Sequence, residues 1–122
     1  MGNFGSDAWR VPINIMMDAN LNNADPWQLQ TYAPRMAAFW KSQGANHGNA
    51  YTPSGSQTSA GHGAGLTGAN AMLAFGLSST DAKPFLQALW DAPIPTGTYR
   101  YYDGCLYLLS LLHLGGKMTL GT

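Results

Sequence analysis

The sequence predicts an all-α protein in which helices are paired by loops. Apolar residues recur at helical spacing in five segments, and proline, glycine and cap residues mark the ends of these segments. No segment shows the convincing alternation of apolar and polar residues that a half-buried strand requires. The loops carry many of the polar and aromatic residues, so we expect functional side chains there.

The first helix is expected from about Asp7 to Asn20, with Ser6 as its N-cap. Four of its apolar residues are spaced to face one side: Trp9, Ile13, Met16 and Met17. The second helix begins at Asp25-Pro26, a cap residue followed by proline at the first helical position, and ends at Gly44. Pro34 should bend this helix, because a proline inside a helix removes a hydrogen bond.

A long polar segment separates these helices from the rest of the chain. Residues 43–65 are rich in glycine, serine, asparagine and threonine and lack periodicity, which is typical of a long functional loop. Three further helices are expected at about 64–77, 79–92 and 103–114, the last ended by Gly115-Gly116. The first of these three carries small residues that would let another helix approach closely: Gly65, Gly68, Ala69, Ala71 and Ala74.

The composition indicates one domain with neutral partners. The 122 residues contain six Lys and Arg and six acidic residues, so the charge balance gives no reason to expect nucleic acid or a membrane as partner. Only 10% of residues are charged, which predicts an apolar or amide-rich surface that favours self-association. The lone Cys105 excludes an internal disulfide, and the longest apolar run, 106–114, is too short to span a bilayer. No secretory signal is visible, which slightly favours a cytoplasmic location.

Asp7, Trp9 and Arg10 place a carboxylate, an indole and a guanidinium within four positions. In the first turn of a helix the macrodipole favours an ionised carboxylate, which suits a general base better than a general acid. Arg10 lies three positions beyond Asp7, close enough to pair with it and hold its rotamer. An ordinary surface ion pair would give the same spacing.

Two separated motifs resemble the carboxy-terminal part of a glycoside hydrolase family 8 enzyme. The first motif is Asp-Ala-Trp-Arg-Val-Pro at 7–12, followed by Asp18 and by Asp-Pro-Trp at 25–27. The second is Ile-Pro-Thr-Gly-Thr-Tyr-Arg-Tyr-Tyr-Asp-Gly at 94–104. The similarity runs from about 4 to 116 and is greatest to the reducing-end xylose-releasing exo-oligoxylanases of that family.

This resemblance implies an inverting hydrolysis of a β-1,4-linked xylan or glucan chain. Asp7 matches the general base of the family, and Arg10 matches the residue that steadies the base and the attacking water. The family folds as a much longer (α/α)6 barrel, so residues 1–122 are expected to be a single domain forming a partial barrel, with about five helices in hairpins and long loops. In the family the general acid is a glutamate in the part missing here, and this chain contains no glutamate.

The other aspartates have simpler explanations. Inverting glycosidases hold their two carboxyl groups ~6.5–9.5 Å apart, whereas Asp18 is three helical turns from Asp7, roughly 16 Å by rise. Two further aspartates start helices and suit capping: Asp25 and Asp81. Asp103 is the better second carboxylate, but a helix cap or an ion pair with Arg100 is the favoured interpretation.

Tyr101, Tyr102 and His62 are the expected substrate-binding residues. The tyrosines offer flat faces and hydroxyls that suit a sugar ring, and the resemblance places a tyrosine matching Tyr101 in the cleft. Core tyrosines would give the same pattern. His62 matches a histidine that walls off the cleft in the exo-oligoxylanases and contacts the reducing-end sugar. Those enzymes follow it with proline, whereas this chain has Gly63, which makes such a wall more mobile.

The three histidines, at 47, 62 and 113, lack the spacing of metal ligands, so neither a metal nor another cofactor is expected. His113 lies in an apolar helix and is expected in the core. Two functions remain open. The first is a glycosidase acting on xylan or xylo-oligosaccharides, weak or dependent on a homo-oligomer that completes the barrel. The second is a non-catalytic carbohydrate-binding or structural half-barrel module.

Overall fold

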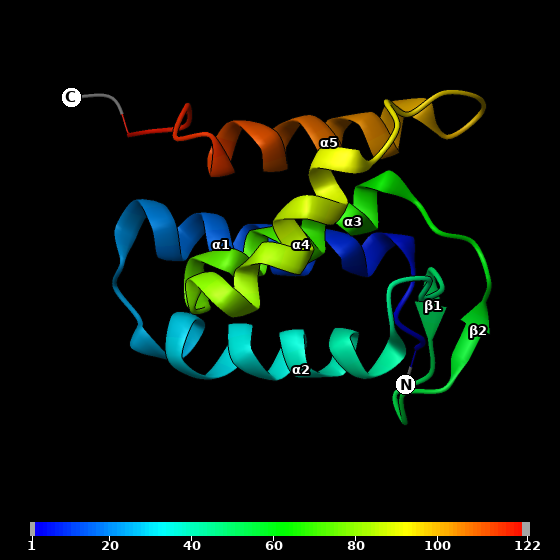
Figure 1. Ribbon diagram of the computed structural model, residues 1–122, viewed down its shortest axis with the longest axis horizontal. Coiled ribbons are helices and arrows are strands. Elements are labelled where there is room, and N and C mark those ends of the chain that lie inside the picture. The colour runs from blue at the N-terminus through cyan, green and yellow to red at the C-terminus, as the bar shows by residue number, and fades with distance from the viewer. Residues whose placement is uncertain (1, 121–122) are drawn as a thin grey trace.

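The computed structural model describes residues 2–120, and most of these residues are helical, as Figure 1 shows. The five main helices are α1 (Arg10–Asn22), α2 (Ala33–Gln43), α3 (Ala64–Met72), α4 (Ser79–Asp91) and α5 (Arg100–Leu114). Their number and order match the sequence prediction, so the all-α class is confirmed. None of the helices in the described part of the chain combines the length and hydropathy needed to cross a membrane.

The first helix begins differently from the prediction. A 3₁₀ turn, η1 (Ser6–Trp9), precedes α1, and no side chain caps it. The expected N-cap at Ser6 is therefore wrong. The turn begins one residue earlier than expected, with the Ala8 amide donating to the Gly5 carbonyl at 2.9 Å, so Ser6 lies inside the turn. The Ser6 carbonyl oxygen instead accepts a hydrogen bond from the Tyr102 hydroxyl, which ties this turn to α5.

The second helix is entered as predicted. The Asp25 carboxylate accepts a hydrogen bond from the Trp27 amide at 2.9 Å. A wider π-helical turn, η2 (Gln28–Tyr32), comes next and leads directly into α2. Pro34 lies just after this turn and has no N–H to donate to a carbonyl of the preceding turn. The helix therefore changes its winding near Pro34, where the sequence predicted a bend.

The polar segment between α2 and α3 is not structureless. It contains a two-stranded antiparallel hairpin, β1 (Ala50–Tyr51) and β2 (Gln57–Ser59), which the sequence analysis missed. Strands of two and three residues are too short to display alternation. Phe4 extends the hairpin, because its amide and carbonyl both bond to Tyr51, at 2.8 and 2.9 Å.

The last two helices begin close to their expected positions. Ser78 caps α4, its hydroxyl accepting a hydrogen bond from the Asp81 amide at 3.2 Å. The α5 helix begins at Arg100, three residues earlier than expected. Between α3 and α4 the chain makes a short 3₁₀ turn, η3 (Leu73–Gly76).

Three helices begin at the same end of the molecule. In Figure 1, α1, α3 and α5 all start on the right, beside the hairpin, while α2 and α4 run back in the opposite direction. Such alternation is what helical hairpins in an α/α barrel require. Its consequence is that the loops before α1, α3 and α5 meet, and these loops carry the predicted site residues.

The α3 helix is the centre of the packing. All residues from Gly65 to Met72 are buried, and a seam of small residues lets α5 lie against α3. A Cβ atom added at Gly68 would stand 2.9 Å from Ser110 Oγ, and one at Gly65 would stand 2.7 Å from Asp103 Oδ1. The predicted close approach is therefore confirmed at Gly65 and Gly68.

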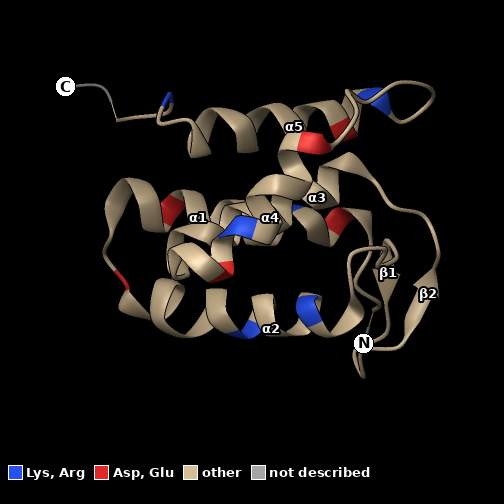
Figure 2. Ribbon diagram, viewed as in Figure 1, with Lys and Arg blue, Asp and Glu red and all other residues tan. Residues whose placement is uncertain are grey.

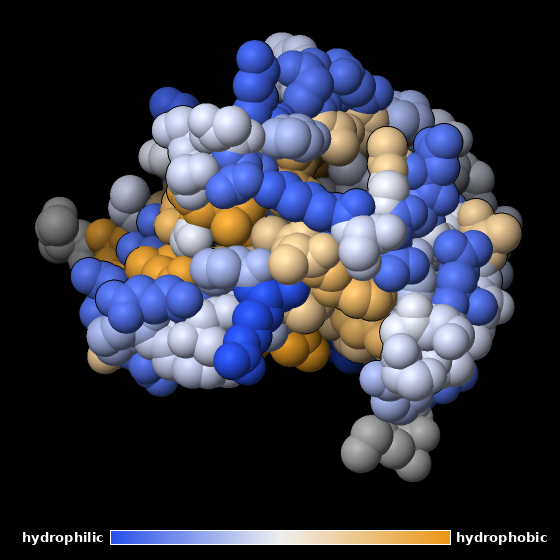
Figure 3. All heavy atoms as spheres, turned by 60° about the horizontal axis from the view of Figure 1, so that its bottom comes forward, coloured by the Kyte–Doolittle hydropathy of each residue, from blue (hydrophilic) through white to orange (hydrophobic). Residues whose placement is uncertain are grey.

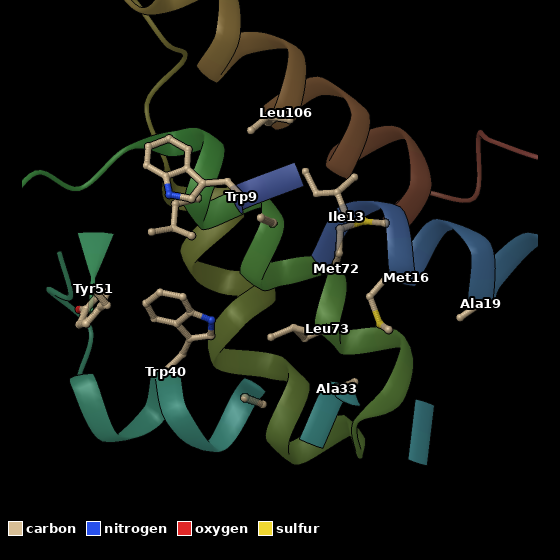
Figure 4. Packing of buried hydrophobic residues seen from close by; sticks show 13 residues of the cluster. Trp9, Ile13, Met16, Ala19, Ala33, Trp40, Tyr51, Met72, Leu73 and Leu106 are labelled. Atoms are coloured by element: carbon tan, nitrogen blue, oxygen red, sulfur yellow. The ribbon is translucent and has the colours of Figure 1, made fainter. Parts of the chain in front are cut away.

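The hydrophobic core lies between α3 and the helices around it, as Figure 4 shows. Three of the four predicted residues of the first helical segment are in the core: Trp9, Ile13 and Met16. Met17 lies at its margin, and Ala19 joins the core without having been predicted. Trp40 and Tyr51 join the core from α2 and the hairpin. His113 is also buried, as expected. Figure 2 shows that the few charged residues are scattered over the helices rather than gathered on one of them.

Candidate active site

Hydrogen bonds tie together the starts of α1, α3 and α5. The Tyr102 hydroxyl donates to the Ser6 carbonyl, which joins α5 to η1. The Gly65 amide donates to Asp103 Oδ1 at 3.2 Å, so a carboxylate on α5 caps the beginning of α3. Asp103 was expected to cap its own helix, but α5 has no side-chain cap, and the carboxylate accepts its hydrogen bond at the start of a neighbouring helix instead. In the described chain Asp103 forms no ion pair with Arg100.

Asn49 links the same region to the loop before α3. Its backbone carbonyl accepts a hydrogen bond from Trp9 Nε1 at 3.0 Å, and its side-chain oxygen accepts one from the Gly63 amide at 2.8 Å. The sequence analysis did not single out Asn49. Its position in a loop rich in asparagine and glycine carries no signal that separates it from its neighbours. Asn49 thus holds the Trp9 indole and the Gly63 backbone in fixed relation.

A hollow of about 450 Å³ opens between these helix starts. We call it the helix-start hollow, and it is lined by Ser6, Trp9, Asn49, Ala50, Ser59, Tyr99, Tyr102 and Asp103. The rings of Trp9 and Tyr102 lie with centroids 6.1 Å apart and planes tilted by 37°. Hydroxyl, amide and carboxylate groups surround these rings, a combination that suits a sugar with an apolar face and a polar edge.

Asp7 follows directly after Ser6, which lines the helix-start hollow, but Asp7 itself is not one of the lining residues. Its side chain is 96% exposed, and Oδ1 lies 3.7 Å from Arg10 Nη2. Arg10 Nε also donates to the Asp7 carbonyl at 3.2 Å. The ion pair is therefore close but open to water, and such a pair contributes little to stability. An open, charged carboxylate is able to accept a proton from a water molecule.

Nearby charges act on Tyr102, one of the residues that line the hollow. Burial raises the pKa of Tyr102, and the charges of Arg10, Asp7 and Asp103 all act on it. Arg10 lowers that pKa, whereas the two carboxylates raise it. Asp18 belongs to a different environment, because Asn22 and Gln28 donate to its carboxylate at 2.6 and 2.7 Å. The hydrogen bond from Gln28, and then the one from Asn22, lower the pKa of Asp18.

The other predicted binding residues are not all in the hollow. Tyr102 lines it, but Tyr101 is 83% exposed and does not, while Tyr99 does. His62 lines a separate cavity of about 270 Å³ together with His47 and other residues. Its Nδ1 lies 2.8 Å from the His47 carbonyl oxygen. Of the five predicted site residues, Tyr102 lines the helix-start hollow and His62 lines the separate cavity, while Asp7, Arg10 and Tyr101 line neither.

The rings of His47 and His62 lie with centroids 4.6 Å apart and planes tilted by 56°. Burial lowers the pKa of His47, and the charge of His62 acts in the same direction. His47 Nδ1 lies 3.1 Å from the Gly48 carbonyl and its Nε2 lies 3.3 Å from Asn70 Nδ2, as a neutral ring with the proton on Nδ1 requires. Over the described residues, no three His, Cys, Asp or Glu side chains are placed to hold a metal ion.

The fold and the arrangement of its helix starts define the class of protein. The model of the family "Glycosyl hydrolases family 8" matches residues 2–116. The chain therefore belongs to glycosyl hydrolase family 8, and its structure is part of that family's (α/α)6 barrel.

Similar proteins point to one branch of this family. The chain is 36% identical over 116 residues to the reducing-end xylose-releasing exo-oligoxylanase Rex8A of Paenibacillus barcinonensis, and 34% identical over 121 residues to one from Halalkalibacterium halodurans. It superposes with a TM-score of 0.86 and 34% identity on a GH8 xylobiose complex from Teredinibacter turnerae. These matches cover 93–95% of this chain but only 29–30% of each relative.

Proposed function

We propose that this chain supplies the general-base part of an inverting hydrolase for β-1,4-xylan or xylo-oligosaccharides. Asp7 accepts a proton from the water that attacks the anomeric carbon, and Arg10 steadies Asp7 and that water. The observation that carries the proposal is the exposed carboxylate of Asp7, which follows Ser6 in the chain, while Ser6 lines a hollow together with the rings of Trp9 and Tyr102. Tyr102 and Tyr99 contact the sugar within the hollow.

Tyr101 and His62 contact sugar units outside the helix-start hollow in this proposal. Tyr101 is the most exposed tyrosine of its motif, so its ring face is open. His62 precedes Gly63, and the space above Gly63 is narrow, since an added Cβ would lie 3.2 Å from the Trp9 ring. A histidine held next to that narrow place is suited to limit how far a chain extends beyond the hollow.

The relatives support xylan as the substrate class. The Teredinibacter turnerae proteins were solved as xylobiose and xylohexaose complexes, and Rex8A was solved with xylose. A neutral polymer also agrees with a chain whose formal net charge is zero. Because this chain spans less than a third of these relatives, its activity is expected to be weaker than that of a complete barrel.

A general acid is the missing part of the reaction. The chain contains no glutamate, and Asp103, the second carboxylate of the hollow, caps α3. We therefore propose a homo-oligomer in which copies complete the barrel and bring a second carboxylate to the cleft. Exposed apolar residues away from the hollow, among them Leu108 and Ile94, support association between copies.

The alternative function is a non-catalytic module that binds xylan through the same aromatic hollow. The use of Asp103 as a cap favours it, because that carboxylate is already engaged. Release of xylose from xylo-oligosaccharides by the purified chain separates the two functions. Binding without any release would establish the module and exclude the hydrolase.

Asp7→Asn tests the proposed base. We expect hydrolysis to fall about 10²–10⁴-fold, because a positioned base contributes that much, with little change in unfolding temperature since the side chain is exposed. Asp91→Asn, at an exposed aspartate on α4, is the matched control and should retain activity. ¹H NMR of the first product should show the α-anomer if the reaction inverts. Undiminished activity in Asp7→Asn would reject Asp7 as the base, and light scattering would test the oligomer.

A further inference from the structure

A second hollow lies along α4 and shares no residue with the helix-start hollow. It has a volume of about 590 Å³ and opens between η3 and α4. We call it the α4 groove, and it is lined by Ala74, Leu77, Ser79, Ala82, Lys83, Leu86, Gln87 and Trp90. On the face drawn in Figure 3, hydrophobic residues lie in recesses between hydrophilic ones.

The α4 side of this groove consists of two parallel rows. Ser79, Lys83 and Gln87 recur every fourth residue and form a polar row about 12 Å long, from the helical rise. The apolar row beside it recurs with the same spacing: Ala82, Leu86 and Trp90. Residues four apart lie on one side of a helix, so each row follows the helix axis. The groove is thus apolar along one edge and polar along the other.

Trp90 stands out among the four tryptophans. Its side chain is 79% exposed, whereas Trp9 and Trp40 are almost fully buried and Trp27 is half exposed beside Tyr32. Leaving an indole in water forgoes the stabilisation that burial of so large a side chain provides. An open indole face next to a groove is therefore available to stack against a flat apolar surface of a ligand.

We propose that the α4 groove is an additional binding site for a xylan chain, with Trp90 stacking on one sugar ring. The choice of xylan rests on the function proposed above. The C–H face of a pyranose covers the indole, and its hydroxyl groups meet the polar row. Gln87 donates to both oxygens of Asp91 at 2.9 and 3.0 Å, which fixes its amide and leaves the amide oxygen to accept from a hydroxyl.

Lys83 favours a sugar over a protein partner in this groove. It forms no ion pair with any residue that the structure describes. A protein surface covering the apolar row would also bury this ammonium, and charged residues are depleted at the centres of protein interfaces because of that cost. Sugar hydroxyls accept hydrogen bonds from the ammonium and leave it partly in water.

The test is binding to soluble xylan, measured by affinity electrophoresis in the Asp7→Asn background so that no substrate is consumed. We expect Trp90→Ala to weaken the apparent Kd about tenfold, a loss of about 1.4 kcal/mol, and Trp90→Phe to retain most of the binding. Trp27→Ala is the matched control, because Trp27 is an exposed tryptophan outside the groove, and it should bind as the parent does. Circular dichroism verifies that each variant is folded.

Equal retardation of Trp90→Ala and its parent would overturn the proposal. The proposal would also be overturned if Trp90→Ala lost the oligomer in sedimentation velocity but bound xylan as before, since Trp90 would then lie in a protein interface. Because binding is read without hydrolysis, an inactive chain that still loses xylan affinity in Trp90→Ala would support the groove while rejecting the proposed catalysis.

Discussion

Two regions of the molecule are held together in different ways: the seam between α3 and α5, and the end where α1, α3 and α5 begin, which we call the helix-start end. In the seam, the glycines of α3 lie directly against α5, with Gly68 against Ser110 and Leu106. The helix-start end consists of loops joined by hydrogen bonds, which Tyr102 donates and which the side chains of Asn49 and Asp103 accept. The seam leaves no room for a side chain, whereas the helix-start end leaves a hollow and an exposed Asp7.

The difference shows what each region is suited for. Close packing of small residues fixes the position of two helices at low cost in side-chain entropy. Hydrogen-bonded loops hold individual groups while leaving space and polar atoms for a ligand. The seam thus acts as the rigid support from which the hydrogen-bonded end positions Asp7 and the aromatic rings.

The largest effect is expected where the seam is overpacked. Gly68→Val places a branched side chain where even a Cβ would lie 2.9 Å from Ser110 Oγ and 3.3 Å from the Leu106 carbonyl. We expect a loss of about 3 kcal/mol in the free energy of unfolding, measured with urea, because the two helices must separate. Gly104→Ala is the control, since nothing lies within 4 Å of its Cβ position, and it should stabilise α5 by up to about 1 kcal/mol. Equal stability of both variants would contradict the close seam.

A smaller effect is expected at the point where the two regions meet. Asp103→Ala removes the carboxylate that accepts from the Gly65 amide at 3.2 Å, so we expect a loss of about 1–2 kcal/mol, as for an N-cap. Asp91→Ala should change the same free energy by less than about 0.5 kcal/mol, because Asp91 contacts only Gln87 of its own helix among the described hydrogen bonds. If the two variants lose the same stability, Asp103 is not a cap between helices.

The seam and the core could be predicted from the sequence because they repeat. Ile13 and Met16 lie at helical spacing, Asp25-Pro26 marks a helix start, and small residues recur along α3; each is a local pattern that tertiary contacts did not override. The family motif directed attention to Asp7 and Arg10, although periodicity alone allowed a plain ion pair.

The helix-start end was harder to predict because its contacts join distant residues. Asn49 and Trp9 are 40 positions apart, and Ser6 and Tyr102 are 96 apart. Whether Tyr99 or Tyr101 lines the hollow depends on where α5 begins; Tyr99 lines it and Tyr101 does not, although both rings are exposed. Spacing in the chain carries no information on such choices.

The smallest effect concerns His113, a polar group placed in the apolar body of α5. His113 is 1% exposed, neither ring nitrogen has a hydrogen-bond partner within residues 2–120, and burial lowers its pKa. Below the unfolded-state pKa of about 6.5, the unfolded chain binds a proton at His113 that the folded chain does not bind. The free energy of unfolding therefore decreases as the pH is lowered, until His113 becomes protonated in the folded chain as well. Urea unfolding from pH 7.5 to 5 should show this slope. His113→Leu should flatten it without abolishing it, because burial also lowers the pKa of His47. An unchanged slope in His113→Leu would show that the ring binds its proton as readily in the folded chain as in the unfolded chain.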